Sequence, residues 1–315
     1  MIGYLLRRVA QSVAVVLVVT IIVFLLLHHL PGGPARAVLG NRATPQQLAQ
    51  FSQQNGLDRP VPIQYLDYLR RWLTGDFGFS YKLNQTVGSL LRQRLPKTLI
   101  LNALALIFTI AVAVPVGIYQ AVRRNRIFDY TATGLSFVCY AAPTFFLGLI
   151  LVLLFAQDLN LLPAEAPQSD GVLPIFADFR AMILPIVTLA LLSIAGFSRY
   201  MRSAVLDNIT QDYVRTARSK GCSSARVLRA HVLRNALVPI ATLVGLSLPA
   251  LFAGALVTES IFNFPGMGLL FWQAAQTSDY PVELGVVLVT AVATVVGSLL
   301  ADVSYVLLDP RVRFS

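Results

Sequence analysis

Six long apolar stretches alternate with polar segments along the chain. A bilayer core about 30 Å thick is crossed by a helix of about 20 mostly apolar residues. Most of the stretches are near this length, and each is predicted to form one transmembrane helix. The stretches cover residues 9–30, 99–122, 130–156, 183–197, 237–257 and 286–308. The predicted fold class is therefore an all-α polytopic membrane protein with six transmembrane helices and a long loop after the first.

The first stretch has a second interpretation, because a secretory signal peptide also begins with basic residues and an apolar run. The sequence Ala35-Arg36-Ala37 is similar to a signal-peptidase site. However, the apolar run is about 22 residues long, whereas the apolar region of a signal peptide usually has about 7–15. We therefore interpret the stretch as a retained helix.

The polar segment that follows the first stretch contains two helical patterns. Thr44 is a typical N-cap, Pro45 suits the first helical position, Gln47 completes a capping box and Gly56 follows the end. Further along, a predicted amphipathic face consists of Tyr65, Leu66, Leu69, Trp72 and Leu73. Such a helix either rests in the membrane interface or docks a soluble partner, and the pattern leaves both roles open.

Prolines fall within several of the apolar stretches. They are Pro115, Pro143, Pro185, Pro239 and Pro249. In a helix bundle, neighbouring helices, Ser or Thr side chains and water can satisfy the carbonyl groups that a proline frees. Kinks at such prolines suit a helix that moves, but they are also common in membrane proteins, so the prolines alone indicate no function.

Composition agrees with the pattern. Hydrophobic residues make up 56% of the chain and charged residues 13%, with a mean hydropathy of +0.68. Soluble domains average about 45–50% apolar and about 25% charged residues. The formal charge of +10 suggests nucleic acid as a partner. However, 15 of the 25 Lys and Arg lie in four segments outside the spans, which are Arg7 and Arg8, Arg123 to Arg126, Arg199 to Arg234, and Arg311 with Arg313. The positive-inside rule explains this distribution, so no nucleic-acid partner is predicted.

The same rule predicts the orientation of the chain. Six crossings place both termini on one side. Segment 157–180 carries four acids and one arginine, and is expected on the outer side. Segment 31–97 carries nine basic residues, but loops longer than about 60 residues escape the charge bias. Both termini are therefore expected to be cytoplasmic.

Signatures of catalytic and metal sites are missing from the sequence. It contains no phosphate-binding GxxxxGK[ST], no HExxH and no GxSxG. His28, His29 and His231 lack ligand spacing, and Cys139 and Cys222 form no CxxC. No catalytic residue and no metal site are predicted.

Two carboxylates lie in or beside the spans. Glu259 is at the outer end of the fifth span, and Asp302 is towards the cytoplasmic end of the sixth, where water or a basic neighbour can solvate it. No clear charged pair lies at the midplane, which argues against ion-driven transport.

The most basic polar segment is QDYVRTARSKGCSSARVLRAHVLRNALVP, residues 211–239. Two helical turns are predicted after Asp212, and Gly221 then stops or bends the helix. Ser223 or Ser224 can cap a second helix, in which Ala225, Leu228 and Val232 would share a face. This cytoplasmic elbow could rest on anionic lipid headgroups. The glycine break and the small pair Thr216-Ala217 instead favour close contact with another protein.

These residues resemble the coupling motif of permease subunits of ATP-binding-cassette importers, and in particular the first (B-type) permease of the dipeptide, oligopeptide and nickel branch. The resemblance covers almost the whole chain. It also rests on GLDRPVPIQYLDYLRRWLTGDFGFS, AAPTFFLGL, VTESIFNFPGMG and DPRVR. The chain departs from the general motif in having Arg215, Thr216 and Ala217 where Glu-Ala-Ala is usual, and Pro239 lies further beyond Gly221.

The resemblance implies a bacterial plasma (inner) membrane protein with several partners. These are a sister permease, two ATPase subunits that bind ATP and Mg, an extracytoplasmic substrate-binding protein and the lipid bilayer. No cofactor is expected in this chain. The implied function is that of a permease that forms half of the translocation pathway for peptides, with nickel chelates and glutathione-like compounds left open. A self-sufficient ion-coupled secondary carrier is the main alternative, and a membrane-embedded hydrolase is the third.

The resemblance also divides the chain into regions. Residues 1–30 form the cytoplasmic N-terminus and first helix, 31–97 the extracytoplasmic helical loop, 98–308 a five-helix core with the coupling elbow at 199–238, and 309–315 a cytoplasmic tail. The expected ATPase-coupling residues are Asp212, Tyr213, Arg215, Thr216, Ala217, Arg218, Lys220, Gly221, Arg234, Asn235 and Pro239. The residues expected along the pathway from their positions in the spans are Tyr140, Thr144, Phe145, Ser198 and Glu259.

Overall fold

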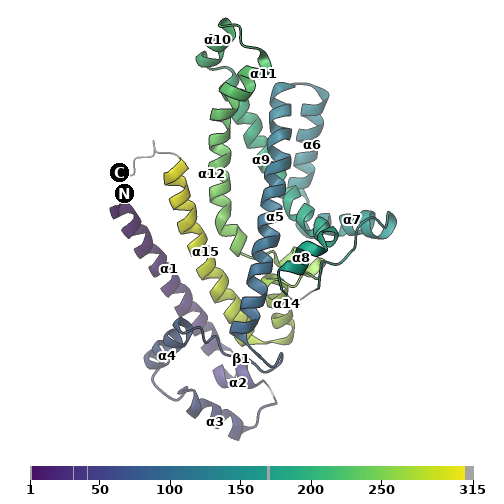
Figure 1. The fold of residues 1–315 in the computed structure, drawn as a ribbon. Coiled ribbons are helices and arrows are strands. Elements are labelled where there is room, and N and C mark those ends of the chain that lie inside the picture. Colours follow the sequence, from purple (N-terminus) through teal and green to yellow (C-terminus); the bar gives the residue numbers. More distant parts are fainter. Residues whose placement is uncertain (1, 31, 41, 169–170, 309–315) are drawn as a thin grey trace.

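The computed structural model describes residues 2–30, 32–40, 42–168 and 171–308 (Figure 1). The expected cytoplasmic tail, 309–315, and the DPRVR sequence within it lie outside the described residues. Among the described residues, helices dominate and the sole sheet is a two-stranded hairpin.

Five stretches of the described chain are long and apolar enough to cross a membrane. They lie in α1 (Ile2–His29), α5 (Val87–Val122), α9 (Phe179–Ile209), the helix that ends with α12 (Leu233–Phe252), and α15 (Tyr280–Leu308). The remaining predicted crossing is broken. It consists of α6 (Ile127–Ala141) and α7 (Thr144–Leu151), the latter continued by the π-helical η1 (Val152–Asp158), with a bend of 110° between them.

The bend occurs at one of the five predicted proline positions. Ala142 and Pro143 both have extended backbone, with ψ of 135° and 139°. The residue before a proline avoids the helical region for steric reasons, so α6 ends there and a new helix begins at Thr144. Pro115, Pro185, Pro239 and Pro249 instead lie inside α5, α9 and α12.

Several helices extend beyond the apolar stretches from which they were predicted. Helix α5 begins at Val87 rather than near residue 99, and α9 runs to Ile209 through Arg199 and Arg202. The apolar pattern ends where charged residues begin, but the backbone hydrogen bonds of the helix continue. Helix α12, in contrast, ends at Phe252, because Gly254 turns the chain with a φ of +79°.

The long helices form a bundle (Figure 1). Helix α5 packs along α9, α12 packs along α15, and α6 lies against α5 and α9. Helix α1 packs mainly along α15. The Arg8 guanidinium forms an ion pair with Asp302, which is the basic neighbour expected for this carboxylate. Much of the surface of α1 is exposed and apolar, as expected for a helix surrounded by lipid.

The segment between α1 and α5 folds into a small unit at one end of the bundle. It contains α2 (Gly33–Leu39), α3 (Pro45–Gln54), α4 (Val61–Leu73) and the antiparallel strands β1 (Phe79–Ser80) and β2 (Gln85–Thr86). The predicted capping box of α3 is confirmed. The Thr44 hydroxyl accepts from the backbone N–H of Gln47 at 3.3 Å, and the Gln47 side chain accepts from that of Thr44 at 2.8 Å.

The predicted face of α4 is only partly right. Tyr65, Leu69 and Trp72 are half-buried, but Leu66 and Leu73 are exposed. Aromatic contacts with α1 set the orientation instead. Tyr65 shares a 2.8 Å hydrogen bond with Thr20, and Tyr68 packs against Phe24. Burial raises the pKa of Tyr68 to about 12.

Short elements complete the fold. Helix α8 (Leu173–Ala177) precedes α9, and α13 (Leu256–Ile261) and α14 (Met267–Thr277) connect α12 to α15. The hydroxyl of Ser80 in β1 donates to the Asp279 carboxylate just before α15, which ties the hairpin to the bundle. At the opposite end, α10 (Asp212–Ser219), α11 (Ser224–Arg226) and the π-helical η2 (Val227–Val232) connect α9 to α12.

Candidate functional site

The basic segment after α9 folds into the predicted elbow. Helix α10 has two turns, and Gly221 then reverses the chain with a φ of +78°. A side chain with a β-carbon is strained at this angle, which explains the glycine. Ser223 occupies the N-cap position of α11, although its side chain makes no capping hydrogen bond.

The inner face of the elbow is buried against the bundle. Val214 is fully buried and Ala217 nearly so. Both belong to an apolar cluster that includes Met201 and Val205 of α9, and Ala236 of α12. Small side chains at these positions allow close packing between α10 and the ends of two long helices. The elbow is therefore part of the bundle rather than a free loop.

The register of the second half of the elbow differs from the prediction. Val227 and Val232 are buried, whereas Ala225 is exposed. The cause is η2, because a π-helical turn places residues five apart, rather than three or four apart, on one face. Leu228 is only partly buried at the edge of the cluster.

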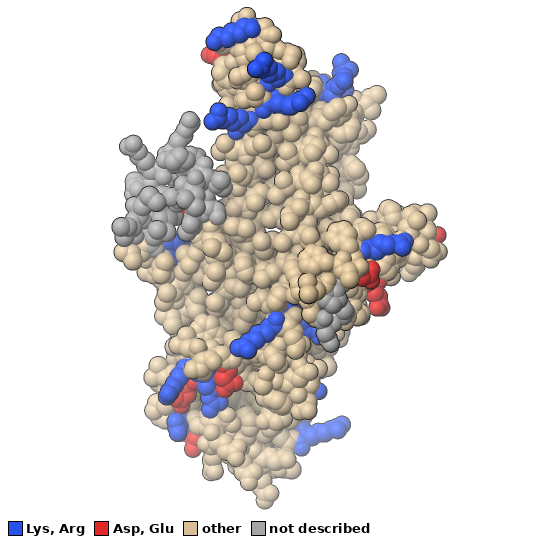
Figure 2. All heavy atoms as spheres, viewed as in Figure 1, with Lys and Arg blue, Asp and Glu red and all other residues tan. Residues whose placement is uncertain are grey.

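The outer face of the elbow is basic and exposed (Figure 2). Arg215, Arg218 and Lys220 project from α10 and the turn after it. Asp212 lies 3.5 Å from Arg215, but the two side chains are 94% and 77% exposed, so this ion pair contributes little. Arg234 and Asn235 at the start of α12 are exposed too.

Local hydrogen bonds fix two of the three remaining predicted coupling residues. The Tyr213 hydroxyl donates to Asn208 of α9 at 2.7 Å, and the Thr216 hydroxyl donates to the backbone of Asp212 at 3.0 Å. Pro239 lies inside α12, close to the elbow. The fold thus brings the eleven predicted coupling residues to one end of the molecule. Their role in coupling stays a prediction.

Two of the predicted pathway residues meet in one cavity. Tyr140 and Ser198 line a cavity of about 260 Å³ between α5, α6 and α9. We call it the α6 cavity. Its other walls include the side chains of Gln120, Thr133 and Arg199. Thr144 and Phe145 lie past the bend, at the start of α7, and do not line it.

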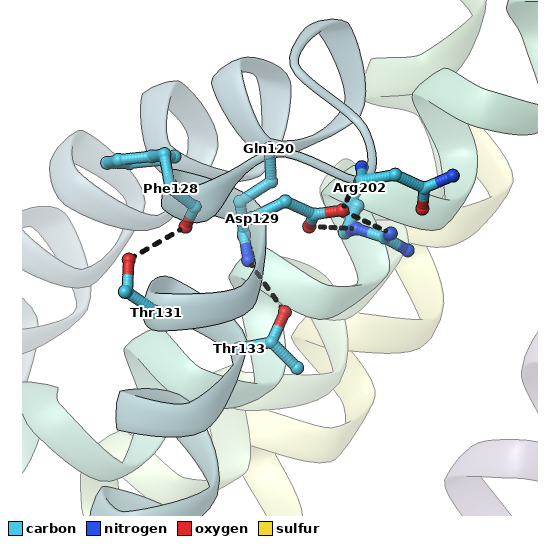
Figure 3. A network of polar contacts seen from close by, with 7 residues as sticks. Gln120, Phe128, Asp129, Thr131, Thr133 and Arg202 are labelled. Atoms are coloured by element: carbon cyan, nitrogen blue, oxygen red, sulfur yellow. Dashed lines mark hydrogen bonds and ion pairs between the residues drawn. The ribbon is translucent and has the colours of Figure 1, made fainter.

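A buried ion pair forms one wall of the α6 cavity (Figure 3). Arg202 Nε donates to Asp129 Oδ1 at 2.7 Å and Arg202 Nη2 donates to Asp129 Oδ2 at 2.8 Å. The same carboxylate accepts from the backbone N–H of Asn125 at 3.0 Å. This two-pronged geometry is the strong form of an arginine–carboxylate contact, and it fastens α6 to α9.

Glu259, the last predicted pathway residue, is fully buried in α13 and lines neither this cavity nor the outer one described below. It accepts from the Thr98 hydroxyl at 2.8 Å and from the backbone N–H groups of Gly268 and Leu269 at 2.6 and 3.0 Å. A carboxylate at the N-terminus of a helix is favoured by the helix dipole. Glu259 therefore joins α5, α13 and α14, and a pathway role for it stays a prediction.

A second cavity lies at the opposite end of the bundle. It measures about 440 Å³ and is enclosed by α1, α2, α3, α4, the β1–β2 hairpin with the segment before it, and α15. Aromatic side chains, including Phe24, Tyr68 and Trp72, form much of its wall. The unit formed by α2–α4 is thereby packed against both α1 and α15.

Sequence reasoning missed Asp129, Arg202 and Gln120. Asp129 was placed just outside the third span, and Arg202 was counted as part of the cytoplasmic charge. An acid and an arginine beside apolar stretches are costly in a membrane unless they pair, and this was the available signal. Asp129 and Arg202 are 73 positions apart, so a pattern of neighbouring residues could not predict that they pair.

Comparisons with known proteins cover the whole chain. Residues 113–314 match the family "Binding-protein-dependent transport system inner membrane component". Residues 1–102 match its companion family, "Binding-prot-dependent transport system membrane comp, N-term".

Similar proteins come from several bacteria. The oligopeptide transport system permease protein AppB of Bacillus subtilis (strain 168) is 38% identical over 316 residues, with 100% of both chains covered. The dipeptide transport system permease protein DppB of Escherichia coli (strain K12) is 37% identical over 336 residues, with 99% of both covered. The glutathione transport system permease protein GsiC of Salmonella choleraesuis (strain SC-B67) is 35% identical over 314 residues, with 100% of both covered.

Proposed function

The chain belongs to the family of binding-protein-dependent transport system inner membrane components, and from this membership we propose that it forms half of the translocation pathway of an ATP-driven peptide importer. It is a multi-pass membrane protein and a permease subunit. A sister permease forms the other half of the pathway. Two ATPase subunits bind ATP and Mg and carry out hydrolysis, and an extracytoplasmic protein delivers the substrate.

Peptides are the proposed substrate class. The three relatives described above are named for the transport of oligopeptides, dipeptides and glutathione. Glutathione is itself a tripeptide, so all three relatives are named for peptide substrates. Their similarity to this chain extends over essentially its full length, which includes every span and the elbow.

The elbow carries the proposed mechanism. Its inner face is buried against α9 and α12, and its outer face is basic and exposed. A partner that pushes on α10 therefore moves the ends of two membrane helices together. We assign this contact to an ATPase subunit, with Arg215, Arg218 and Lys220 orienting the elbow by charge. ATP can shift the permease between inward- and outward-facing states only if the elbow docks differently in the two states.

The orientation of the chain in the membrane follows from the assignment of the elbow to an ATPase subunit. The elbow and both termini lie in the cytoplasm, and the unit formed by α2–α4 lies outside. Figure 1 supports this arrangement, because the elbow and the α2–α4 unit occupy opposite ends of the bundle. The α2–α4 unit is then the proposed docking surface for the substrate-binding protein.

Substitution of Gly221 tests the coupling role. With a φ of +78°, valine is strongly strained at this position, whereas asparagine tolerates the left-handed region. In the reconstituted complex, Gly221→Val should abolish substrate-stimulated ATP hydrolysis and uptake, while Gly221→Asn should retain most of both. The amount of permease in the membrane, measured by immunoblot, should be the same for both variants. Normal uptake by Gly221→Val would falsify the coupling role.

A secondary carrier, the alternative from a different class, needs acids that are free to exchange ions. Asp129 and Asp302 are each paired with an arginine, and Glu259 is held by Thr98 and backbone N–H groups. These contacts favour the ATP-driven mechanism. Uptake that survives ATP depletion but stops when the ion gradient is collapsed would instead support the carrier.

A further inference from the structure

The α6 cavity contains two polar groups that the described residues leave without a partner. Gln120 is only 2% exposed, and its Nε2 donates to Thr133 at 3.2 Å, but its Oε1 accepts no hydrogen bond within the described chain. If the amide is turned over, its nitrogen is left instead. Arg199 at the cavity wall has no hydrogen bond or ion pair to any described residue. A buried polar atom without a partner is costly, so the Gln120 oxygen points to a ligand, and the exposed side chain of Arg199 is free to contact that ligand.

The charged residues around the cavity indicate the sign of the charge that the ligand carries. Asp129 is already neutralised by Arg202. The turn between α5 and α6, whose Asn125 lines the cavity, adds Arg123, Arg124 and Arg126, so positive charge is in excess at this end. A zwitterionic peptide needs a free carboxylate for its ammonium group, and the cavity offers none among its described lining residues. An anionic ligand therefore fits the cavity better than a zwitterionic peptide does.

The size and position of the cavity further narrow the range of anionic ligands that fit it. Its volume of about 260 Å³ is below the range of about 300–1,000 Å³ that is typical for drug-sized ligands. It begins at the end of α5 and the start of α6, where headgroups meet membrane helices, and it extends along α6 as far as Tyr140. Phe137 and Tyr140 line it and are 60% and 61% exposed, and they offer apolar surface on which an acyl chain can lie.

We propose that the α6 cavity binds the headgroup of an anionic phospholipid of the bilayer that carries free hydroxyl groups, as phosphatidylglycerol does. The phosphate accepts from Arg199, and a glycerol hydroxyl donates to the free amide oxygen of Gln120. The acyl chains run along the exposed face of α6. Basic pockets between membrane helices on the cytoplasmic side are known to bind anionic headgroups, which agrees with the proposed orientation.

Lipid retention by the complete chain tests this site. The purified protein is exchanged into detergent with phosphatidylglycerol or phosphatidylethanolamine, and bound lipid is counted by native mass spectrometry. Phosphatidylglycerol should be retained at least about fivefold better than phosphatidylethanolamine. Arg199→Gln should remove this preference, because a factor of about five corresponds to the attraction of one basic residue for an anionic headgroup. Arg226→Gln is the matched control, because it removes the same charge from the same end of the molecule outside the cavity.

Two further variants make the test independent of folding defects. Arg199→Lys keeps the charge and should keep the binding. Gln120→Leu should remove the preference for phosphatidylglycerol over phosphatidic acid, which lacks the glycerol hydroxyls. An equal loss in Arg199→Gln and Arg226→Gln would overturn the proposal, since it would indicate diffuse attraction. Displacement by glycerol 3-phosphate would assign the cavity to a soluble phosphate, and displacement by a dipeptide would assign it to the substrate. Either result also overturns the proposal.

Discussion

At the residue scale, Asp129 and Asp212 each pair with an arginine, but in opposite surroundings. The side chain of Asp129 is 3% exposed and holds Arg202 through two short hydrogen bonds. The side chain of Asp212 is 94% exposed and touches Arg215 at 3.5 Å. Removal of one partner from a buried pair leaves an uncompensated charge, whereas water replaces the partner at the surface.

The two aspartates should therefore respond differently to the same substitution. We expect Asp129→Asn to lower the free energy of unfolding by about 2 kcal/mol, less than for a fully buried pair because Arg202 is partly exposed. Asp212→Asn should change it by less than about 0.5 kcal/mol. Unfolding of the purified protein by titration with a denaturing detergent measures both. Equal effects would mean that the buried pair contributes no more than the exposed one.

Close approach of α5 and α9 depends on one glycine. A β-carbon added to Gly117 would lie 2.5 Å from the backbone oxygen of Ser198 and 2.7 Å from Cβ of Met201. The two helices would have to move apart, because these atoms belong to or adjoin the backbone.

Gly117→Ala should therefore destabilise the protein by about 1–3 kcal/mol, the usual cost of overpacking. The melting temperature in detergent provides the measurement. Gly134→Ala in α6 is the control, since no described atom outside the neighbouring turns of α6 lies within 4 Å of its added β-carbon, and alanine is the better helix former. A melting temperature that is lowered equally by both substitutions would show that helix packing is not the cause.

At the scale of elements, the local signals in the sequence were sufficient for some features. Thr44 and Gln47 cap α3 through contacts three residues apart, and Gly221 breaks the elbow through its own backbone angle. Features that depend on neighbouring helices could not be read from the sequence. Pro143 bends the chain whereas Pro185 stays inside α9, so a proline in an apolar stretch does not by itself predict a bend.

The π-helical turn η2 is the clearest case of such dependence. The α-helical spacing placed Ala225 on one face with Leu228 and Val232, but Ala225 is exposed and packing of the elbow buries Val227 together with Val232. The one extra residue in this turn lets α10 and α12 both reach the same apolar cluster. A pattern based on regular helices has no means to predict it.

Changes of length in η2 test this interpretation. Deletion of the exposed Ala230 places Val227 and Val232 four residues apart, on one face of an ordinary α-helix, so the elbow should stay docked. Insertion of one alanine at the same place separates them by six residues and should detach it. Docking is measured by the rate at which Cys222, which packs against the cluster, reacts with a maleimide in a Cys139→Ser background. The interpretation fails if the deletion raises this rate as much as the insertion does.

At the scale of the whole molecule, the proposed orientation places Cys222 and α3 on opposite sides of the membrane. In intact cells, a membrane-impermeant maleimide should label Gln53→Cys in α3 and leave Cys222 unmodified until the membrane is permeabilised. The exposed position of Gln53 makes it a suitable probe, with Cys139→Ser and Cys222→Ser as background for that measurement. Labelling of Cys222 alone in intact cells would reverse the orientation.

The pairing of α1 with α15 has a consequence for the order of events during synthesis. Arg8 and Asp302 are 294 positions apart, and ribosomes add about 5–20 residues per second. Helix α1 therefore spends about 15–60 s in the membrane before its partner exists. Lipid can cover its apolar surface in that interval, but it offers Arg8 no carboxylate. A nascent chain that stops early thus keeps an unpaired arginine at the edge of the bilayer, which the finished protein does not.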